Sequence, residues 1–223
     1  PRSDSSAASD VYKRQALHGL RLSETSLGSK VVVIGLGIIG QLVCRLAEAQ
    51  GSEVIGIDPD TKRTDLSANF YTSVEEANMT NVDSVIITAA TSSNEPIEVA
   101  TKIARNKAKI VVVGDIPLNI SRNDFYYKEL ELVVSKSYGP GRYDKQYEIL
   151  GKDYPIEYVR WTENRNFEAF IKLLSQYQIH LLDLVTEEVS FENAPSIYKK
   201  FSGEDKPLSV VLRYDNKSEP KID

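Results

Sequence analysis

The sequence of 223 residues is poor in the residues that build metal centres and covalent cross-links. Its one cysteine, Cys44, excludes an internal disulfide framework and a zinc site made of several thiolates. Its two histidines, His18 and His180, lie too far apart for a local metal motif. No apolar run reaches the roughly 18 residues of a membrane span, and no secretory signal is visible. These absences predict a cytoplasmic protein with no metal and no membrane contact.

An excess of positive charge is also missing. Lys and Arg number 27 against 32 Asp and Glu, for a net charge of -5. Since a nucleic-acid footprint needs a basic face, we expect no nucleic-acid partner. The chain contains no Tyr-x-x-x-Lys, which disfavours a short-chain dehydrogenase, and no Walker-type phosphate loop.

The chain does contain a regular alternation of buried strand patterns and amphipathic helix patterns. Continuous β-branched runs are typical of parallel strands that are buried on both faces. The alternation predicts an α/β protein with a six-stranded, doubly wound parallel sheet of the Rossmann type over about residues 28–137. The strands recognised from the pattern are Lys30–Ile34, Glu53–Ile57, Val82–Thr88, Ile110–Gly114 and Leu130–Ser135, the last counted as the sixth.

Helix signals lie between these strands and beyond them. Apolar residues at helical spacing follow the first strand as far as Ala49. Ser73–Glu76 has the form of a capping box, which indicates the start of a second helix. Asn94 is placed to cap a third helix that runs to about Asn106. Further patterns predict a helix beginning at Ser121–Asp124, helices over Asn164–Gln178 (apolar face Phe167, Phe170, Ile171 and Leu174) and Phe191–Phe201, and a strand over Pro207–Tyr214.

The turn Gly35–Gly40, GLGIIG, connects the first strand to the first helix of the sheet. A GxGxxG pattern in this position is typical of dinucleotide binding. Gly35 permits the tight turn, Gly37 lets the backbone approach a pyrophosphate, and Gly40 lets the helix pack closely on the sheet. The helix N-terminus, with Ile38 and Ile39, then offers free N–H groups to the phosphates.

Asp58 ends the second strand, 18 residues after Gly40 and near the offset of the acid that binds a ribose. A carboxylate there accepts the ribose hydroxyls and repels a 2′-phosphate, which favours NAD over NADP. Lys62 and Arg63 follow closely and leave some tolerance of a phosphate.

Several segments together resemble the medium-chain dehydrogenase/reductase superfamily, the zinc-type alcohol dehydrogenases and their relatives. They are LGSKVVVIGLGIIGQLVCRLAEAQGSEVIGIDPDTKR (Leu27–Arg63), VIITAATSSNEP (Val85–Pro96), IVVVGDI (Ile110–Ile116) and FENAPSIYKKF (Phe191–Phe201). Residues Ser137–Phe170 are similar to two-module oxidoreductases of bacterial polysaccharide gene clusters, in which a second nicotinamide-dependent module is fused.

The resemblance implies an NAD(P)-dependent oxidoreductase that moves hydride to or from an alcohol or carbonyl substrate, possibly a sugar. It implies that Arg63 lies beside the adenine, that Thr88 and Ala89 lie near the nicotinamide ribose, and that Val113, Gly114 and Asp115 receive the carboxamide. No catalytic residue is assigned. The superfamily's N-terminal GroES-like β-barrel, on which the C-terminal helices would pack, is expected to be missing, and the chain to bind NAD without turnover.

Four segments are expected along the chain. Residues 1–15 are interpreted as a non-native tail, because Ser5–Gln15 matches the translation of a DNA-library adapter. Residues 16–137 form the NAD-binding domain, 138–214 the C-terminal part of the dehydrogenase module, and 215–223 a linker or tail.

Three questions stay open at this point. The loop YGPGRYD (Tyr138–Asp144) either contacts a substrate or packs against the missing domain. The strand Leu130–Ser135 is a candidate for pairing with its copy in a homodimer. The alternative function is a non-catalytic, nucleotide-sensing Rossmann module of a transport regulator, which does not account for the segments that follow the sixth strand.

Cys44 is interpreted as a core residue and Glu187–Glu188 as part of a solvated face.

Overall fold

The computed structural model describes residues 6–67, 69–176, 178–201 and 206–214. The expected linker over 215–223 and the first five residues of the expected tail lie outside these ranges. The chain divides into two compact units: Asp10–Ile179 forms one, and Pro1–Ser9 with His180–Asp223 forms the other. In the described part of the chain, no helix combines the length and apolar character required to cross a membrane.

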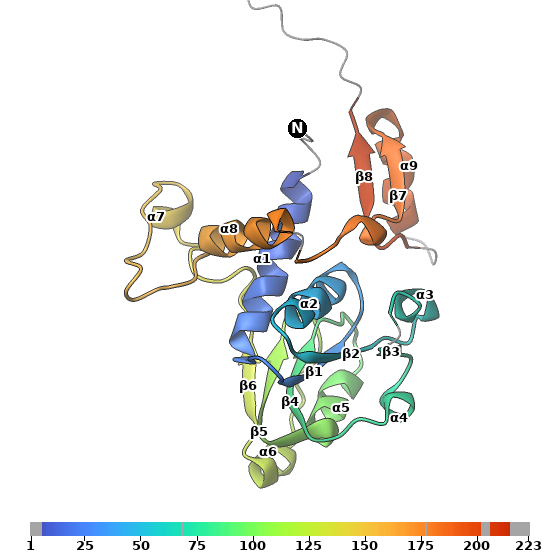
Figure 1. The fold of residues 1–223 in the computed structure, drawn as a ribbon, viewed down its shortest axis with the longest axis vertical. Coiled ribbons are helices and arrows are strands. Elements are labelled where there is room, and N and C mark those ends of the chain that lie inside the picture. The colour runs from blue at the N-terminus through green and yellow to red at the C-terminus, as the bar shows by residue number, and fades with distance from the viewer. Residues whose placement is uncertain (1–5, 68, 177, 202–205, 215–223) are drawn as a thin grey trace, which may run out of the picture. The chain divides into compact units, whose positions relative to one another are not determined.

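The larger unit is built on a six-stranded parallel sheet (Figure 1). The strand order is β3-β2-β1-β4-β5-β6, so the order reverses between β1 and β4. This is the Rossmann order, and it confirms the predicted fold class. The strands are β1 (Lys30–Ile34), β2 (Glu53–Ile57), β3 (Phe70–Tyr71), β4 (Val82–Ile87), β5 (Ala104–Val112) and β6 (Glu131–Val134).

Helices cover both faces of this sheet. In Figure 1, α2 lies on one face, and α5 and α6 lie on the other. A Cβ atom at Gly19 would come within 2.6 Å of Cγ2 of Val113, so α1 packs directly against the chain that leaves β5. The helices are α1 (Ser6–Leu22), which belongs to this unit from Asp10 onward, α2 (Ile38–Ala49), α3 (Thr61–Thr64), α4 (Val74–Ala77), α5 (Glu95–Ile103), α6 (Arg122–Lys128), α7 (Lys145–Glu148) and α8 (Glu163–Ser175).

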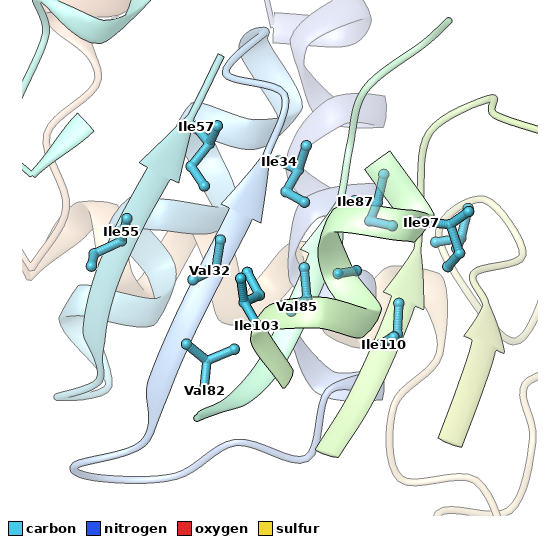
Figure 2. Packing of buried hydrophobic residues seen from close by; sticks show 12 residues of the cluster. Val32, Ile34, Ile55, Ile57, Val82, Val85, Ile87, Ile97, Ile103 and Ile110 are labelled. Carbon is cyan, nitrogen blue, oxygen red and sulfur yellow. The ribbon is translucent and has the colours of Figure 1, made fainter. Parts of the chain in front are cut away.

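One part of the core lies between the sheet and α5. Figure 2 shows Ile97 and Ile103 of α5 over branched side chains of the four central strands. Val32 of β1 lies opposite Ile55 of β2 and Val85 of β4, so one face of the sheet carries an unbroken apolar row. Burying each such side chain stabilises the fold by roughly 1.5–3 kcal/mol. These contacts hold the carboxyl ends of the strands at one edge, where the candidate site lies.

Several boundaries differ from the predictions. The third strand, β3, has two residues and had not been located. The helix expected to reach Asn106 ends at Ile103, because β5 begins at Ala104 and pairs with β4. Asn94 makes no side-chain capping bond to α5, and its amide instead donates to Glu98 and to the carbonyl of Asn119.

The two ends of the larger unit also depart from expectation. Helix α1 begins at Ser6, so helical structure covers the described part of the segment that we interpreted as a non-native tail. In α8 the buried residues are Glu163, Asn166 and Phe170, whereas Ile171 is 41% exposed. Of the four apolar residues predicted on one face of this helix, Phe170 is therefore buried and Ile171 is exposed, and the helix runs over Glu163–Ser175 rather than Asn164–Gln178.

The smaller unit contains a second parallel pair of strands, β7 (Glu187–Ser190) and β8 (Val210–Arg213). Between them lie a short 3-10 turn, η2 (Phe191–Asn193), and the helix α9 (Ala194–Phe201), as the pattern predicted; η1 (Leu182–Leu184) precedes them. Glu187 and Glu188 were expected on a solvated face. Glu188 is exposed, but both residues lie within β7 and Glu187 is only half-exposed, so this interpretation was incomplete.

Candidate dinucleotide site

The glycine turn has a geometry that excludes side chains at two positions. Gly35 has φ +96°, and a Cβ atom there would lie 2.5 Å from the backbone nitrogen of Ala89. A Cβ atom at Gly40 would lie 1.9 Å from the carbonyl oxygen of Gly35. The turn is therefore folded tightly against its own helix and against the chain that leaves β4.

Gly37 differs from these two glycines, because a Cβ atom there would meet nothing within 4 Å. It is the N-cap residue of α2, with φ −63°, and no side chain caps the helix. The backbone N–H groups of Ile38 and Ile39 point out of the helix without an intrahelical acceptor. Open space beside unclaimed donors at the positive end of a helix suits a phosphate.

Thr88 ties the turn to the end of β4. Its hydroxyl donates to the carbonyl of Gly35 over 2.5 Å and lies 3.3 Å from that of Ile34. The backbone N–H groups of Thr88 and Ala89 both donate to Ile34. The shape of the turn is therefore held by its neighbour in the sheet rather than by the glycines alone.

Asp58 is 3% exposed and directly contacts the glycine turn. Its Oδ2 accepts the N–H of Leu36 over 2.7 Å and a guanidinium N–H of Arg63 over 3.1 Å, while its Oδ1 accepts the N–H of Asp60 over 3.0 Å. A carboxylate offers about four lone-pair sites. Three are occupied, so one remains on Oδ1 for a ligand hydroxyl.

Arg63 lies between two carboxylates. Its Nη1 is 3.1 Å from Oδ2 of Asp58 and its Nε is 3.3 Å from Oδ2 of Asp60. Its side chain is 36% exposed, so part of the cation stays accessible from solvent. Arg63 therefore lies beside Asp58, and its expected place beside the adenine stays a prediction.

Gln41 was missed by the sequence analysis. It is 1% exposed, and its amide nitrogen lies 3.4 Å from the carbonyl oxygen of Leu36 and 3.3 Å from that of Arg63. Leu36 is thus held on both its N–H and its C=O. The sequence signal that could have revealed Gln41 is a polar residue on the otherwise apolar face of the helix that follows the glycines.

The remaining predicted positions lie beyond β4 and β5, at the same edge of the sheet. A Cβ atom at Gly114 would lie 2.0 Å from the carbonyl oxygen of Ala89, so these two loops are in close contact. The N–H groups of Val113 and Gly114 both donate to Ile87, and the carbonyl of Asp115 accepts the N–H of Thr91. The amide hydrogens of Val113 and Gly114 are therefore already used, and a ligand beside these two residues would meet carbonyl groups.

Two further expectations concern Cys44 and metal ions. Cys44 is 1% exposed in α2, and burial raises the pKa of its thiol, which confirms it as a core residue. Among the described residues, no group of three or more His, Cys, Asp or Glu side chains is arranged to hold a metal ion.

Comparison with known proteins agrees with this geometry. Residues 3–124 match the family model described as D-isomer specific 2-hydroxyacid dehydrogenase, NAD binding domain. A 2-dehydro-3-deoxy-L-galactonate 5-dehydrogenase of Pseudoalteromonas atlantica (strain T6c / ATCC BAA-1087) is 29% identical over 155 residues, which cover 60% of this chain and 43% of that protein. D-guloside 3-dehydrogenase of Escherichia coli (strain K12) is 25% identical over 217 residues, 88% of this chain and 57% of that protein.

Solved structures show the same fold. Galactitol-1-phosphate dehydrogenase from Escherichia coli superposes with a TM-score of 0.70 at 21% identity, covering 92% of this chain and 59% of that one. For 2R,3R-butanediol dehydrogenase from Bacillus subtilis the TM-score is 0.69 at 18% identity, covering 92% and 56%. The chain thus spans about half the length of the relatives that it matches.

These matches confirm the resemblance to the medium-chain alcohol and sugar dehydrogenases. The family model matches residues 3–124, which is more than half of the chain. The chain therefore belongs to the family described as D-isomer specific 2-hydroxyacid dehydrogenase, NAD binding domain.

Proposed function

We propose that this chain is the cofactor-binding part of an NAD-dependent oxidoreductase that acts on an alcohol or carbonyl group of a sugar-related substrate. The observation that carries the proposal is the contact between Asp58 and Leu36. It places a buried carboxylate with a free acceptor site directly beside the unclaimed N–H groups at the start of α2. The similar proteins described above are sugar and polyol dehydrogenases, which supports the substrate class.

The residues present fit the dinucleotide. The N–H groups of Gly37, Ile38 and Ile39 would receive the pyrophosphate, and the open space beside Gly37 would accommodate it. Asp58 would accept a ribose hydroxyl, and Arg63 would lie along the adenine. When bound, the nicotinamide supplies the hydride acceptor or donor. The protein would position it beside the carbonyl groups that follow β4 and β5.

NAD is favoured over NADP at this site. A 2′-phosphate would approach the carboxylates of Asp58 and Asp60, and both already engage the guanidinium of Arg63. Displacing Arg63 toward a phosphate would leave Asp58 buried with one partner fewer. We therefore expect NADP to bind at least about tenfold more weakly, the equivalent of one charged hydrogen bond.

The test is a calorimetric titration of the whole chain with NAD+, NADH, NADP+ and NADPH. Saturable heat with NAD(H), and weaker heat with NADP(H), supports the proposal. A well-folded chain that gives no heat with any of the four dinucleotides overturns it. In parallel, NADH absorbance is followed with NAD+ and a panel of polyols, and we expect binding without turnover.

A homodimer through β6 is part of the proposal. β6 is the last strand in the sheet order, and Val134 at its end is 59% exposed. An uncovered edge strand can pair with its own copy. Light scattering after size exclusion should give twice the chain mass, and Val134→Lys should return the monomer. A monomeric parent chain contradicts this pairing.

A further inference from the structure

A cavity of about 390 Å³ lies beyond the carboxyl end of β6, between α1 and the loop Gly139–Asp144. All its lining residues belong to the larger unit. Its volume falls in the range of small-molecule sites, roughly 300–1,000 Å³. None of the residues to which we assign the dinucleotide lines it.

His18 is the most buried titratable group of this cavity. Its side chain is 9% exposed, and its ring packs on Gly139, where a Cβ atom would lie 2.8 Å from Nδ1. Within the described ranges its ring nitrogens make no hydrogen bond. Burial, followed by the charge of Arg21, lowers the pKa of the imidazole. His18 is therefore neutral near pH 7, with one donor and one acceptor to offer.

The two cationic side chains of the cavity, Arg142 and Lys136, differ in their ion pairing. Arg142 is paired with Glu148 over 2.6 Å and lies against the ring of Tyr143. Lys136, by contrast, makes no ion pair with any residue that the structure describes, and its ammonium lies 5.6 Å from the Tyr143 ring centroid. The ammonium group of Lys136 is therefore held by no ion pair among the described residues, although the carboxylate of Asp144 is near enough for the two charges to interact.

Asp144 supplies the opposite charge on the same wall. Its Oδ2 accepts the hydroxyl of Tyr154 over 2.5 Å and its Oδ1 accepts the N–H of Gln146 over 2.8 Å. The bond from Tyr154 contributes most to lowering the pKa of Asp144, so the carboxylate is ionised. It has acceptor sites left for hydroxyl groups, and it repels a ligand that carries two negative charges.

We propose that this cavity binds a sugar acid, a small polyhydroxylated carboxylate. The carboxylate of the ligand meets Lys136, its hydroxyl groups meet His18 and Asp144, and its C–H face packs on Tyr143. Each lining group then has a partner of matching chemistry. The inference does not depend on dinucleotide binding, because the two sites share none of these residues.

The experiment uses the whole chain, without dinucleotide, and follows the imidazole signals by NMR at constant pH near neutrality. Since the chain has two histidines, a His180→Gln variant assigns the His18 signal. The probe is D-gluconate. The control ligand is D-sorbitol, an uncharged analogue that carries an alcohol in place of the carboxylate. Gluconate should shift the His18 signal saturably, and sorbitol should bind at least about tenfold more weakly.

Two variants test whether the charge of Lys136, rather than the shape of the cavity, accounts for gluconate binding. Lys136→Met should weaken gluconate binding about tenfold and leave sorbitol binding unchanged. Lys145→Met, at an exposed residue of α7 that does not line the cavity, is the matched control and should change neither. Lys136 is exposed, so its variant is expected to fold, which the melting temperature verifies.

Three results overturn the inference. They are an unshifted His18 signal, sorbitol binding equal to gluconate binding, and a Lys136→Met variant that binds gluconate as tightly as the parent. Tighter binding of glucose 6-phosphate than of gluconate also contradicts it, because the argument from Asp144 requires a single negative charge. Heat with NAD+ in the same preparation shows separately whether the dinucleotide site is intact.

Discussion

Replacement of Asp58 by asparagine tests the dinucleotide site most directly. The shape of the side chain is kept, but the charge is lost and only one oxygen remains to accept hydrogen bonds. That oxygen can serve the N–H of Leu36 and the guanidinium of Arg63, while the new amide then faces the N–H of Asp60. A donor is thus placed against a donor in a site that is 3% exposed.

The magnitude follows from these three contacts. The bond from Leu36 loses its charge assistance, about 1–1.5 kcal/mol, and the orphaned Asp60 N–H costs about 1 kcal/mol. The share of Arg63 is reduced to about 0.5 kcal/mol, since its side chain is 36% exposed. We expect the free energy of unfolding to fall by about 3 kcal/mol, or roughly 6–12 °C in melting temperature for a chain of this size.

Asp58→Asn should also weaken NAD+ binding at least about tenfold, measured by calorimetry below the melting transition. Asp83→Asn is the matched control, because Asp83 accepts the N–H of Lys30 over 2.8 Å and that of Arg105 over 2.6 Å. It lies at the opposite ends of the strands and is more exposed. We expect a smaller loss of stability there and unchanged NAD+ affinity. If Asp58→Asn binds NAD+ as tightly as the parent, Asp58 is a structural residue and the assignment of the site is wrong.

Three further predictions follow from single contacts. Gly40→Ala should unfold or strongly destabilise the chain, whereas Gly37→Ala, whose methyl group would enter open space, should keep the melting temperature and lose NAD+ affinity; equal effects of the two substitutions on melting would refute this contrast. Lys128 donates to three carbonyl groups at the end of α5, so Lys128→Met should lower the free energy of unfolding by about 2 kcal/mol in denaturant titrations, and an unchanged midpoint would argue against it. Burial raises the pKa of Cys44, so iodoacetamide should label the denatured chain but not the native one near neutral pH; rapid labelling of native protein would contradict the buried position.

The sequence was most informative where burial dictates a repeating pattern. The β-branched runs of β1 and β2 have the bounds that the pattern predicted, because strands buried on both faces tolerate few other residues. β3 has two residues, too few to show a period, and β7 begins with two glutamates. Strands of this kind are formed by pairing with a neighbour, and local sequence does not reveal the neighbour.

The same limit applies to the site. The three glycines and Asp58 could be predicted as site residues because their spacing reflects the geometry of one βαβ unit. Gln41 was not found, since its role depends on carbonyl groups of Leu36 and Arg63 that come together only in the folded chain. His18 likewise reads as an ordinary histidine until Gly139 is brought against its ring.

The double hold on Leu36, by Asp58 on its N–H and by Gln41 near its C=O, has a consequence for the energetics of recognition. Because the turn is held in one conformation, nearly all molecules have the conformation that binds the ligand. The apparent dissociation constant then lies close to the intrinsic one, and little conformational entropy is lost on association. Asp58, to which we assign the ribose, therefore also holds the glycine turn in shape before any nucleotide binds.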